Sequence, residues 1–342
     1  MPCTEAALQA GGRVGGRPAA GSVVRSMPSM RRLAAVLAAL ALAAACSGDD
    51  EPIVASGAGS STTTTTTAPA GTAGTTASPA ASSSTAAPPP TARPTTTAVA
   101  GTTTLAEGDP ASVAVAVAAS EAAIRDPGTP VSDLERHGRA QQVAYRQLAA
   151  HPEWLDRVLD GVPASLRDTV RANVGAGTEL RALTKPQPAL PPWRIVAPAP
   201  AEELLGYYRA AEAALGVPWN YLAAIHLVET RMGRIRGTST AGAQGPMQFL
   251  PATWAQYGEG GDIDSNRDSI LAAARYLARN GAPADLNRAL FAYNHSQRYV
   301  NAVTAYAGQM GSAERAYLGY YHWQVYYRMA DGDHLLPVGY GS

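Results

Sequence analysis

The sequence predicts a mainly α-helical fold that follows a long, disordered N-terminal part. Apolar residues recur at near-helical spacing from Val113 to Ile124, and around Leu222 they cover most of a helix surface. Proline and glycine stand where helices begin and end, and no alternation of apolar and polar residues is visible between 109 and 200. We expect an N-terminal extension with a signal, a disordered linker, a helical segment with a proline-rich boundary, a second helical domain and a tail, at residues 1–46, 47–108, 109–200, 201–330 and 331–342.

The composition argues against several classes of function. The chain has 342 residues and a formal net charge of +0, so it offers no basic face of the kind that nucleic-acid binding requires. Its 2 cysteines, Cys3 and Cys46, form neither a Cys-x-x-Cys pair nor a cluster with histidine. We therefore expect no nucleic-acid partner, no cofactor and no metal site.

The stretch that ends at Cys46 has the order of parts that marks a secretory signal. Met30 is followed by two arginines, an apolar run fills 33–45, and small residues precede the cysteine. The run is too short to cross a hydrocarbon core about 30 Å thick as a helix. Its end resembles a bacterial lipobox, although the usual leucine stands one place further from the cysteine, at Leu42. That resemblance implies a lipid on Cys46 and anchoring to the outer face of the cytoplasmic membrane; the alternative is an ordinary signal cleaved near Ala45 and a secreted protein.

We expect residues 47–108 to be a flexible tether. Thr, Ser, Ala, Pro and Gly dominate this stretch, and positions 62–67 are all threonine. Such a composition has too little apolar bulk to offset the entropy of ordering the chain. As a flexible coil the linker spans roughly 40 Å, which lets a membrane-anchored domain work within the cell wall.

The segment from 109 to 200 is expected to contain three helices. Asp109 and Pro110 form an N-cap followed by proline at the first helical position. Two further helices are predicted across 132–150 and 165–183, where His-Pro and Gly-Val-Pro sequences separate the helical patterns. Six prolines between 186 and 200 then mark a boundary, which we expect to be extended and packed across the surface.

A buried helix with one acidic residue is predicted from Pro218 to Met232, with Gly233 as the left-handed residue after its end. Glu229 lies on the same side as Leu222 and Ile225, in the last turn of this apolar helix. Burial and the negative end of the helix dipole both disfavour the charged carboxylate, so its pKa should be raised, as a general acid requires. The alternative is an ion pair with a nearby arginine: Arg231, Arg234 or Arg236.

After Glu229 the sequence forms a Gly-x-x-Gly-x-Met-Gln-Phe loop and then a Pro-x-Thr-Trp helix start. The residues of these two motifs are Gly242, Gly245, Met247, Gln248, Phe249, Pro251, Thr253 and Trp254. The run from Tyr221 to Trp254 is therefore similar to the lysozyme-like lytic transglycosylases, in which a glutamate followed by serine closes the helix before these motifs. Thr230 stands in place of the serine and keeps the hydroxyl, so we count it among the substrate-binding candidates. The resemblance covers about residues 201–310 and implies a lysozyme-like fold for the second helical domain.

The resemblance also indicates which residues bind the sugar. Gln248 carries both a donor and an acceptor, as recognition of an N-acetyl group needs. Met247 and Phe249 would supply apolar walls, although a role in the core is an equal alternative. Tyr293 and Asn294 lie in an Ala-Tyr-Asn sequence like the family's, whose tyrosine lines the cleft near the catalytic glutamate. Tyr293 could therefore hydrogen-bond Glu229, and Asn294 could bind sugar or hold the turn.

The activity that the resemblance implies is cleavage of the β-1,4 bond between N-acetylmuramic acid and N-acetylglucosamine in peptidoglycan glycan strands. Glu229 would act first as acid and then as base, and the muramic 6-hydroxyl would close a 1,6-anhydro ring without water. Most glycosidases use two carboxylates, but only one has a convincing setting in this sequence. The alternatives are a goose-type lysozyme-like hydrolase and a catalytically inactive peptidoglycan-binding lipoprotein.

An acidic stretch after residue 261 invites comparison with a calcium loop. Its oxygen-bearing side chains alternate as in an EF-hand, at Asp262, Asp264, Asn266 and Asp268. Arg267 stands where the EF-hand needs glycine, and Ala273 stands where it needs glutamate. We therefore favour helix capping by Ser265, Asn266 or Asp268 over metal binding.

The final aromatic stretch, 317–327, is expected to be a terminal helix whose tyrosines and tryptophan pack it against the domain.

Overall fold

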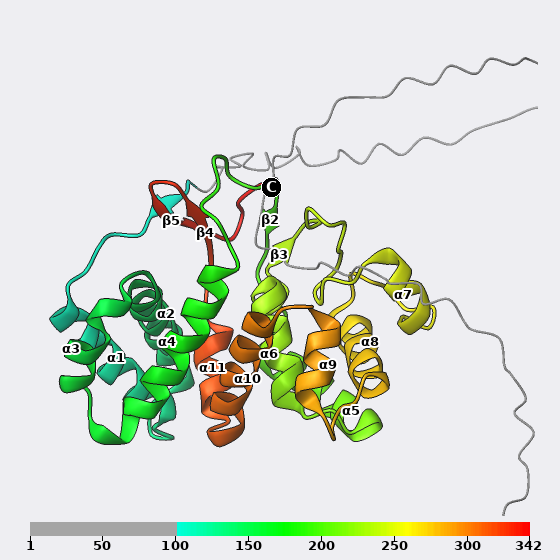
Figure 1. Ribbon diagram of the computed structural model, residues 1–342, viewed down its shortest axis with the longest axis horizontal. Coiled ribbons are helices and arrows are strands. Elements are labelled where there is room, and N and C mark those ends of the chain that lie inside the picture. The colour runs from blue at the N-terminus through cyan, green and yellow to red at the C-terminus, as the bar shows by residue number, and fades with distance from the viewer. Residues whose placement is uncertain (1–100) are drawn as a thin grey trace, which may run out of the picture. The chain divides into compact units, whose positions relative to one another are not determined.

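The fold of residues 101–342, the part of the chain that this computed structural model describes, is built mainly from α-helices (Figure 1). This confirms the mainly helical fold class. The predicted signal, Cys46 and the linker up to residue 100 lie outside the described residues. The helices are α1 (Pro110–Arg125), α2 (Leu134–Ala150), α3 (Leu155–Asp160), α4 (Arg167–Ala182), α5 (Ala201–Leu215), α6 (Trp219–Thr230), α7 (Pro251–Tyr257), α8 (Asn266–Arg279), α9 (Leu286–Tyr293), α10 (Gln297–Ser312) and α11 (Arg315–Tyr321). The strands are β1 (Thr103–Thr104), β2 (Arg194–Ile195), β3 (Ile235–Arg236), β4 (Val325–Met329) and β5 (Gly332–Leu336).

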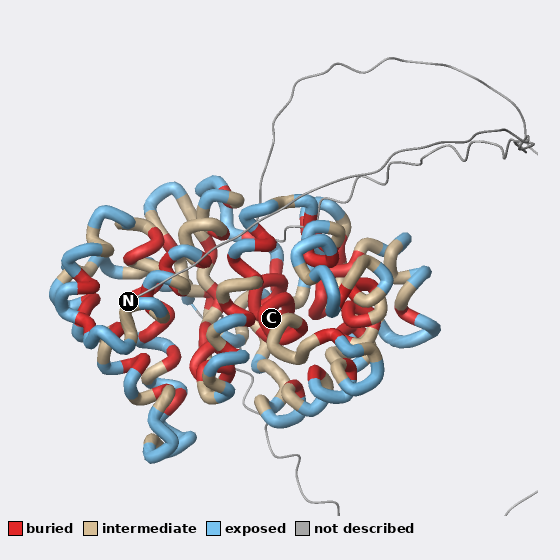
Figure 2. Tube along the Cα trace, turned by 60° about the horizontal axis from the view of Figure 1, so that its bottom comes forward, coloured by how far each residue is buried: buried red, intermediate tan, exposed pale blue. Residues whose placement is uncertain are grey.

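The first four helices form from the signals that the sequence carries. Asp109 caps α1, because its carboxylate accepts hydrogen bonds from the backbone N–H groups of Ala111 and Ser112, at 2.9 and 3.1 Å. Helix α2 packs against α1 and α4, and buried apolar residues of all three helices belong to one core. Figure 2 shows the buried residues of the described chain in red. The short helix α3 lies between the two sequences that were expected only to separate helices.

Helix α4 joins this segment to the helices that follow, since it packs along α10. At their contact the carboxylate of Glu179 accepts hydrogen bonds from Arg298 Nη1 at 2.6 Å and from Asn301 Nδ2 at 3.0 Å. One apolar core runs from Val113 in α1 to Trp323 after α11. The helical segment is therefore part of the same packed unit as the helices around α6.

Helix α6 lies at the centre of the second group of helices. Every side chain from Leu222 to Thr230 is buried, and α5, α8, α10 and α11 surround the helix. Because this helix is apolar on nearly all sides, it stabilises the folded protein only when it is completely buried. No helix among residues 101–342 has the length and apolar character needed to span a membrane.

The C-terminal residues differ from the prediction. The helix expected across 317–327 ends at Tyr321, and the expected tail contains strand β5, which pairs antiparallel with β4 and with β1. The helix prediction was wrong because Val325 and Tyr327 alternate with less buried residues and pack inward as a strand. Their partners in this small second core include Trp193.

The proline-rich boundary also contains a strand. Strand β2 pairs antiparallel with β3, so that Arg194 lies opposite Arg236 and Ile195 lies opposite Ile235. This pairing ties the boundary to the chain that leaves α6.

Candidate active site

Glu229 lies in the last turn of α6 and is 2% exposed. Its Oε1 accepts a hydrogen bond of 2.7 Å from the hydroxyl of Tyr299 in α10. The three arginines considered as ion-pair partners donate elsewhere, each to a backbone carbonyl: Arg231 to Leu227, Arg234 to Arg231 and Arg236 to Asp264. Within the described residues, Glu229 therefore forms no ion pair with any of these three arginines.

Burial raises the pKa of Glu229 from its ordinary value to about 8, and the hydrogen bond from Tyr299 lowers it by a smaller amount. The carboxyl therefore holds its proton at neutral pH. A group that must donate a proton works below its pKa, so this carboxyl can act as an acid until the pH rises through about 8.

The end of α6 fixes the position of this carboxyl. The helix ends at Thr230, two residues earlier than predicted, and the left-handed backbone begins at Arg231 (φ 54°) and continues through Met232 (φ 60°) to Gly233 (φ 77°). The N–H groups of Arg231 and Met232 bond the carbonyls of the last helical turn at 3.2 and 3.1 Å. Met232 is fully buried, and this packing holds non-glycine residues in a conformation that they rarely adopt.

Gln248 lies in the glycine-rich loop and is held there by two hydrogen bonds to one backbone carbonyl. The backbone N–H of Gln248 and its Nε2 both donate to the carbonyl oxygen of Gly245, at 3.1 and 2.9 Å. Gln248 has φ 53° and is 3% exposed, and its Oε1 is buried without a hydrogen-bond partner. A buried, unsatisfied acceptor costs free energy, so this oxygen favours a ligand that brings an N–H group.

Thr230 connects α6 to the same loop. Its hydroxyl donates to the carbonyl of Pro246 at 2.6 Å and accepts from the N–H of Gly233 at 3.1 Å. The side chain is fully buried. The hydroxyl that was expected to bind substrate therefore holds the loop against the end of the helix.

Tyr293 has a different partner from the expected one. Its hydroxyl donates to the carbonyl of Met247 at 2.6 Å, and its ring stacks on Tyr299 with centroids 6.4 Å apart. The hydrogen bond to Glu229 comes from Tyr299, so the expectation for Tyr293 was wrong in its partner, although the residue lies in the same cluster. The signal for Tyr299 was its place on the apolar face of α10 with Val303 and Tyr306, because a buried tyrosine hydroxyl needs an acceptor.

The remaining candidates are buried. Met247 is fully buried and Phe249 is 3% exposed, with its ring edge-to-face against those of Trp254 and Tyr293 at 5.6 and 6.0 Å. Both therefore pack in the core and hold the loop in place. Asn294 is 5% exposed and follows directly after α9, where its backbone N–H bonds the carbonyl of Leu290 at 3.0 Å.

The helices around α6 were compared with known protein families. Residues 206–315 match the family described as the transglycosylase SLT domain. The chain contains an SLT transglycosylase domain. Neither the search of curated proteins nor that of solved structures gave a match.

The SLT domain runs from within α5 to the start of α11 and includes every predicted site residue of the described chain. Its fold is lysozyme-like, and the family acts on peptidoglycan through a lytic transglycosylase type of activity. The domain therefore implies a peptidoglycan substrate, which is consistent with a location in the cell envelope. The helices α1 to α4 and the sheet β1-β5-β4 lie outside the matched range.

In the acidic loop of the SLT domain, residues 262–268, side chains accept hydrogen bonds from the backbone of the same loop. Ser265 caps α8 by accepting from the N–H of Asp268 at 3.3 Å, which confirms the capping expected from the sequence. Asp268 accepts in turn from the N–H of Asp262 at 3.0 Å, and Asp262 accepts from that of Asp264 at 2.9 Å. Among residues 101–342, no three acidic, histidine or cysteine side chains are grouped so as to hold a metal.

The bond between Tyr299 and Glu229 predicts a change in pH dependence. Replacing Tyr299 with phenylalanine removes a hydrogen bond that lowers the pKa of Glu229, so this pKa should rise further above about 8. The alkaline limb of the pH–rate profile should then move to higher pH, by about one unit. The measurement is glycan cleavage from pH 5 to 10.

The matched control is Tyr306→Phe, which alters a buried tyrosine two turns further along α10. The control should leave the alkaline limb in place. An equal shift in both variants would show that general loosening of α10, and not the bond to Glu229, sets the profile.

Proposed function

We propose that the SLT domain cleaves the β-1,4 bond between N-acetylmuramic acid and N-acetylglucosamine and releases 1,6-anhydro-N-acetylmuramic acid ends. The observation that carries this proposal is Glu229, a buried carboxyl with a pKa of about 8 and no cationic partner within the described residues. Such a group is protonated at neutral pH and can give its proton to a leaving oxygen.

The first step breaks the glycosidic bond. The Glu229 proton passes to the bridging oxygen, which leaves with the bonding electron pair as the 4-hydroxyl of N-acetylglucosamine. The acetamido oxygen of the muramic residue bonds to C1 and carries the positive charge that develops there. The unpartnered Oε1 of Gln248 is a suitable acceptor for an acetamido N–H, so we assign it to orienting this group.

The second step returns the proton. The oxygen of the muramic 6-hydroxyl attacks C1, and the bond between C1 and the acetamido oxygen breaks. The hydroxyl proton goes to the Glu229 carboxylate. No water is consumed, and Glu229 ends as it began. This route requires one carboxyl, and other acids of the domain have partners of their own. Glu259 is paired with Arg275 at 2.6 Å, and Asp262 and Asp268 accept hydrogen bonds from backbone N–H groups of their own loop.

Mass spectrometry of the products tests the proposal. Purified peptidoglycan sacculi digested with the protein should release fragments that are lighter by one water than the corresponding hydrolysed fragments. Hydrated products would assign a goose-type hydrolase instead. Binding to sacculi without release of any fragment would assign a module that only holds peptidoglycan.

The anchor remains a prediction from the sequence. A lipid on Cys46 would hold the protein at the membrane, with the linker as its tether to the wall.

A further inference from the structure

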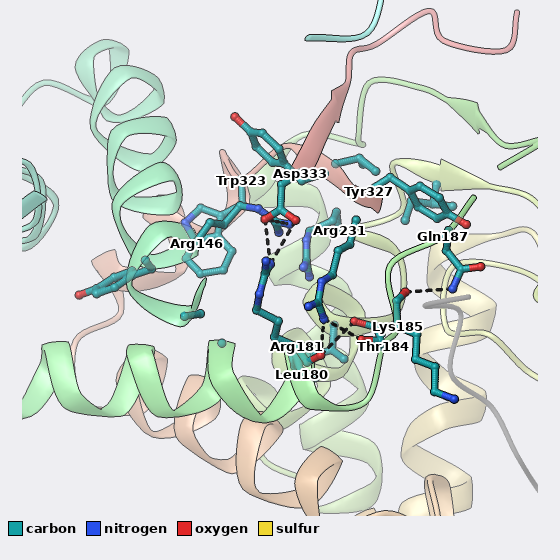
Figure 3. A pocket seen from close by; sticks show the side chains of 18 of the residues that line it. Arg146, Leu180, Arg181, Thr184, Lys185, Gln187, Arg231, Trp323, Tyr327 and Asp333 are labelled. Carbon is teal, nitrogen blue, oxygen red and sulfur yellow. Dashed lines mark hydrogen bonds and ion pairs between the residues drawn. The ribbon is translucent and has the colours of Figure 1, made fainter. Parts of the chain in front are cut away.

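A pocket with an excess of positive charge lies where the helical segment, the C-terminal sheet and the SLT domain meet (Figure 3). Helices α2 and α4, strands β4 and β5, and helices α6 and α10 all contribute to its lining. Its cavity volume is about 80 Å³. The charged side chains that line it are five cations and a single carboxylate: Arg146, Arg181, Lys185, Arg231, Arg328 and Asp333.

The carboxylate balances only part of this charge. Asp333 is 7% exposed and pairs with Arg146 at 2.7 Å and with Arg181 at 3.1 Å (Figure 3). Arg328 Nη1 donates to the carbonyls of Arg181 and Thr184, at 3.0 and 2.8 Å. A carbonyl satisfies an N–H group but carries no net charge. The lining therefore keeps an excess of four positive charges.

Two of the arginines lack a full set of partners. The Nε of Arg146 is buried and has no hydrogen-bond partner. Arg231 donates one hydrogen bond of 2.6 Å to the carbonyl of Leu227. Its pKa is lowered to about 10, first by burial and then by repulsion from Arg146 and Arg234. The side chains of Arg146 and Arg231 are only partly exposed, and positive charge withdrawn from water without a full counter-charge is costly. An anion that enters the pocket would therefore be stabilised by the positive charge that Asp333 leaves unbalanced.

The pocket borders the helix that carries the catalytic carboxyl. Val228, the residue before Glu229 in α6, and Arg231, which follows the end of the helix, both line the pocket. Tyr306 lines it from α10 and follows Tyr299 by seven residues, which is two helical turns or about 10 Å. An extended peptide covers that distance in about three residues.

We propose that this pocket binds a carboxylate of the peptide stem that peptidoglycan carries on its muramic residues. The inference rests on the proposed function, because it takes the substrate of Glu229 as its source of anions. A guanidinium matches a carboxylate with two parallel hydrogen bonds, and the aromatic walls, Trp323 and Tyr326 among them, strengthen such bonds by excluding water. Parts of the chain outside the SLT match would then select substrates that carry stems.

Two substrates with the same sugar backbone test this proposal. One is a glycan strand with its peptide stems, and the other is the same strand after an amidase has removed them. The readout is the ratio of kcat/KM for the first substrate to that for the second. We expect a ratio well above one for the natural protein.

Two substitutions should lower this ratio. Lys185 is exposed and is the lysine of the lining, so Lys185→Glu alters its charge without disturbing the core; it should reduce the ratio about threefold to fivefold. Arg146→Gln removes the buried unpartnered donor and should reduce the ratio about tenfold or more. The matched control is Arg157→Glu, an exposed charge reversal on α3 outside the pocket, which should leave the ratio unchanged.

The outcomes separate the two proposals. Cleavage of both substrates at equal rates, or a ratio that Lys185→Glu leaves unchanged, overturns the pocket proposal while the proposed function stands. A natural protein that cleaves neither substrate overturns the proposed function and removes the basis of this inference. If Arg146→Gln fails to fold, the Lys185→Glu ratio decides alone.

Discussion

Replacing Glu229 with glutamine should abolish glycan cleavage and at the same time make the folded protein more stable at pH 7. General acid catalysis contributes on the order of a hundredfold to ten-thousandfold, and here one carboxyl serves both proton transfers. Glutamine keeps the shape of the neutral acid and can still accept the bond from Tyr299. It has no proton to give, so we expect a loss of at least about a thousandfold in kcat.

The gain in stability follows from the raised pKa. In the unfolded chain Glu229 ionises at its ordinary pKa, whereas in the folded protein it stays protonated until about pH 8. Between these two pKa values the unfolded chain releases the proton while the folded protein keeps it, and this release lowers the free energy of the unfolded state. The stability of the natural protein therefore falls as the pH rises. Glutamine removes that effect, which amounts to about 3 kcal/mol at pH 7 as an upper value.

Thermal unfolding at two pH values measures this effect. The Glu229→Gln protein should have the higher Tm at pH 7, and the difference should nearly vanish at pH 4, where both states of the natural protein are protonated. The matched control is Glu259→Gln, because Glu259 is 63% exposed and paired with Arg275. It should retain activity and show no such gain. A Glu229→Gln protein that is active, or less stable at pH 7, would contradict the assignment of a buried, protonated acid.

Replacing Gly245 with alanine should cause the second large effect, a loss of both stability and activity. Gly245 has φ 73°, and a Cβ placed on it would lie 2.0 Å from the carbonyl oxygen of Ile263. No rotamer relieves such a clash with backbone, so the loop must move. We expect a decrease in the free energy of unfolding of about 3 kcal/mol or more. Activity should fall even below the new Tm, because both bonds that position Gln248 end on the Gly245 carbonyl.

Gly242 provides the control for backbone conformation alone. It also has a positive φ, 84°, but a Cβ there meets no atom within 4 Å. Gly242→Ala should therefore cost only about 1 kcal/mol. Urea unfolding of the two variants measures the difference, and equal losses would show that the contact with Ile263 does not govern the loop.

Local signals were enough for much of the fold and for the principal site residue. The capping of α1 by Asp109, the start of α7 at Pro251 and the capping of α8 by Ser265 depend on residues close in sequence, and the structure has each of them. The burial of Glu229 also followed from the apolar surroundings within its own helix.

Distant contacts decided what local patterns left open. The expected tail contains strand β5, which pairs not only with the neighbouring β4 but also with Thr103 and Thr104, more than two hundred residues away. The end of α6 moved to Thr230 because burial of Met232 holds a left-handed backbone there.

By itself, the sequence determined the helical class, the SLT motif and the buried acid, because helix periodicity, caps and motif spacing are properties of neighbouring residues. Only the tertiary structure decided that Tyr299, and not Tyr293, bonds Glu229, and that Arg146, Arg231 and Asp333 line one pocket. The physical reason is that hydrogen-bond partners and the balance of charge depend on which distant surfaces pack together, and no local pattern encodes that.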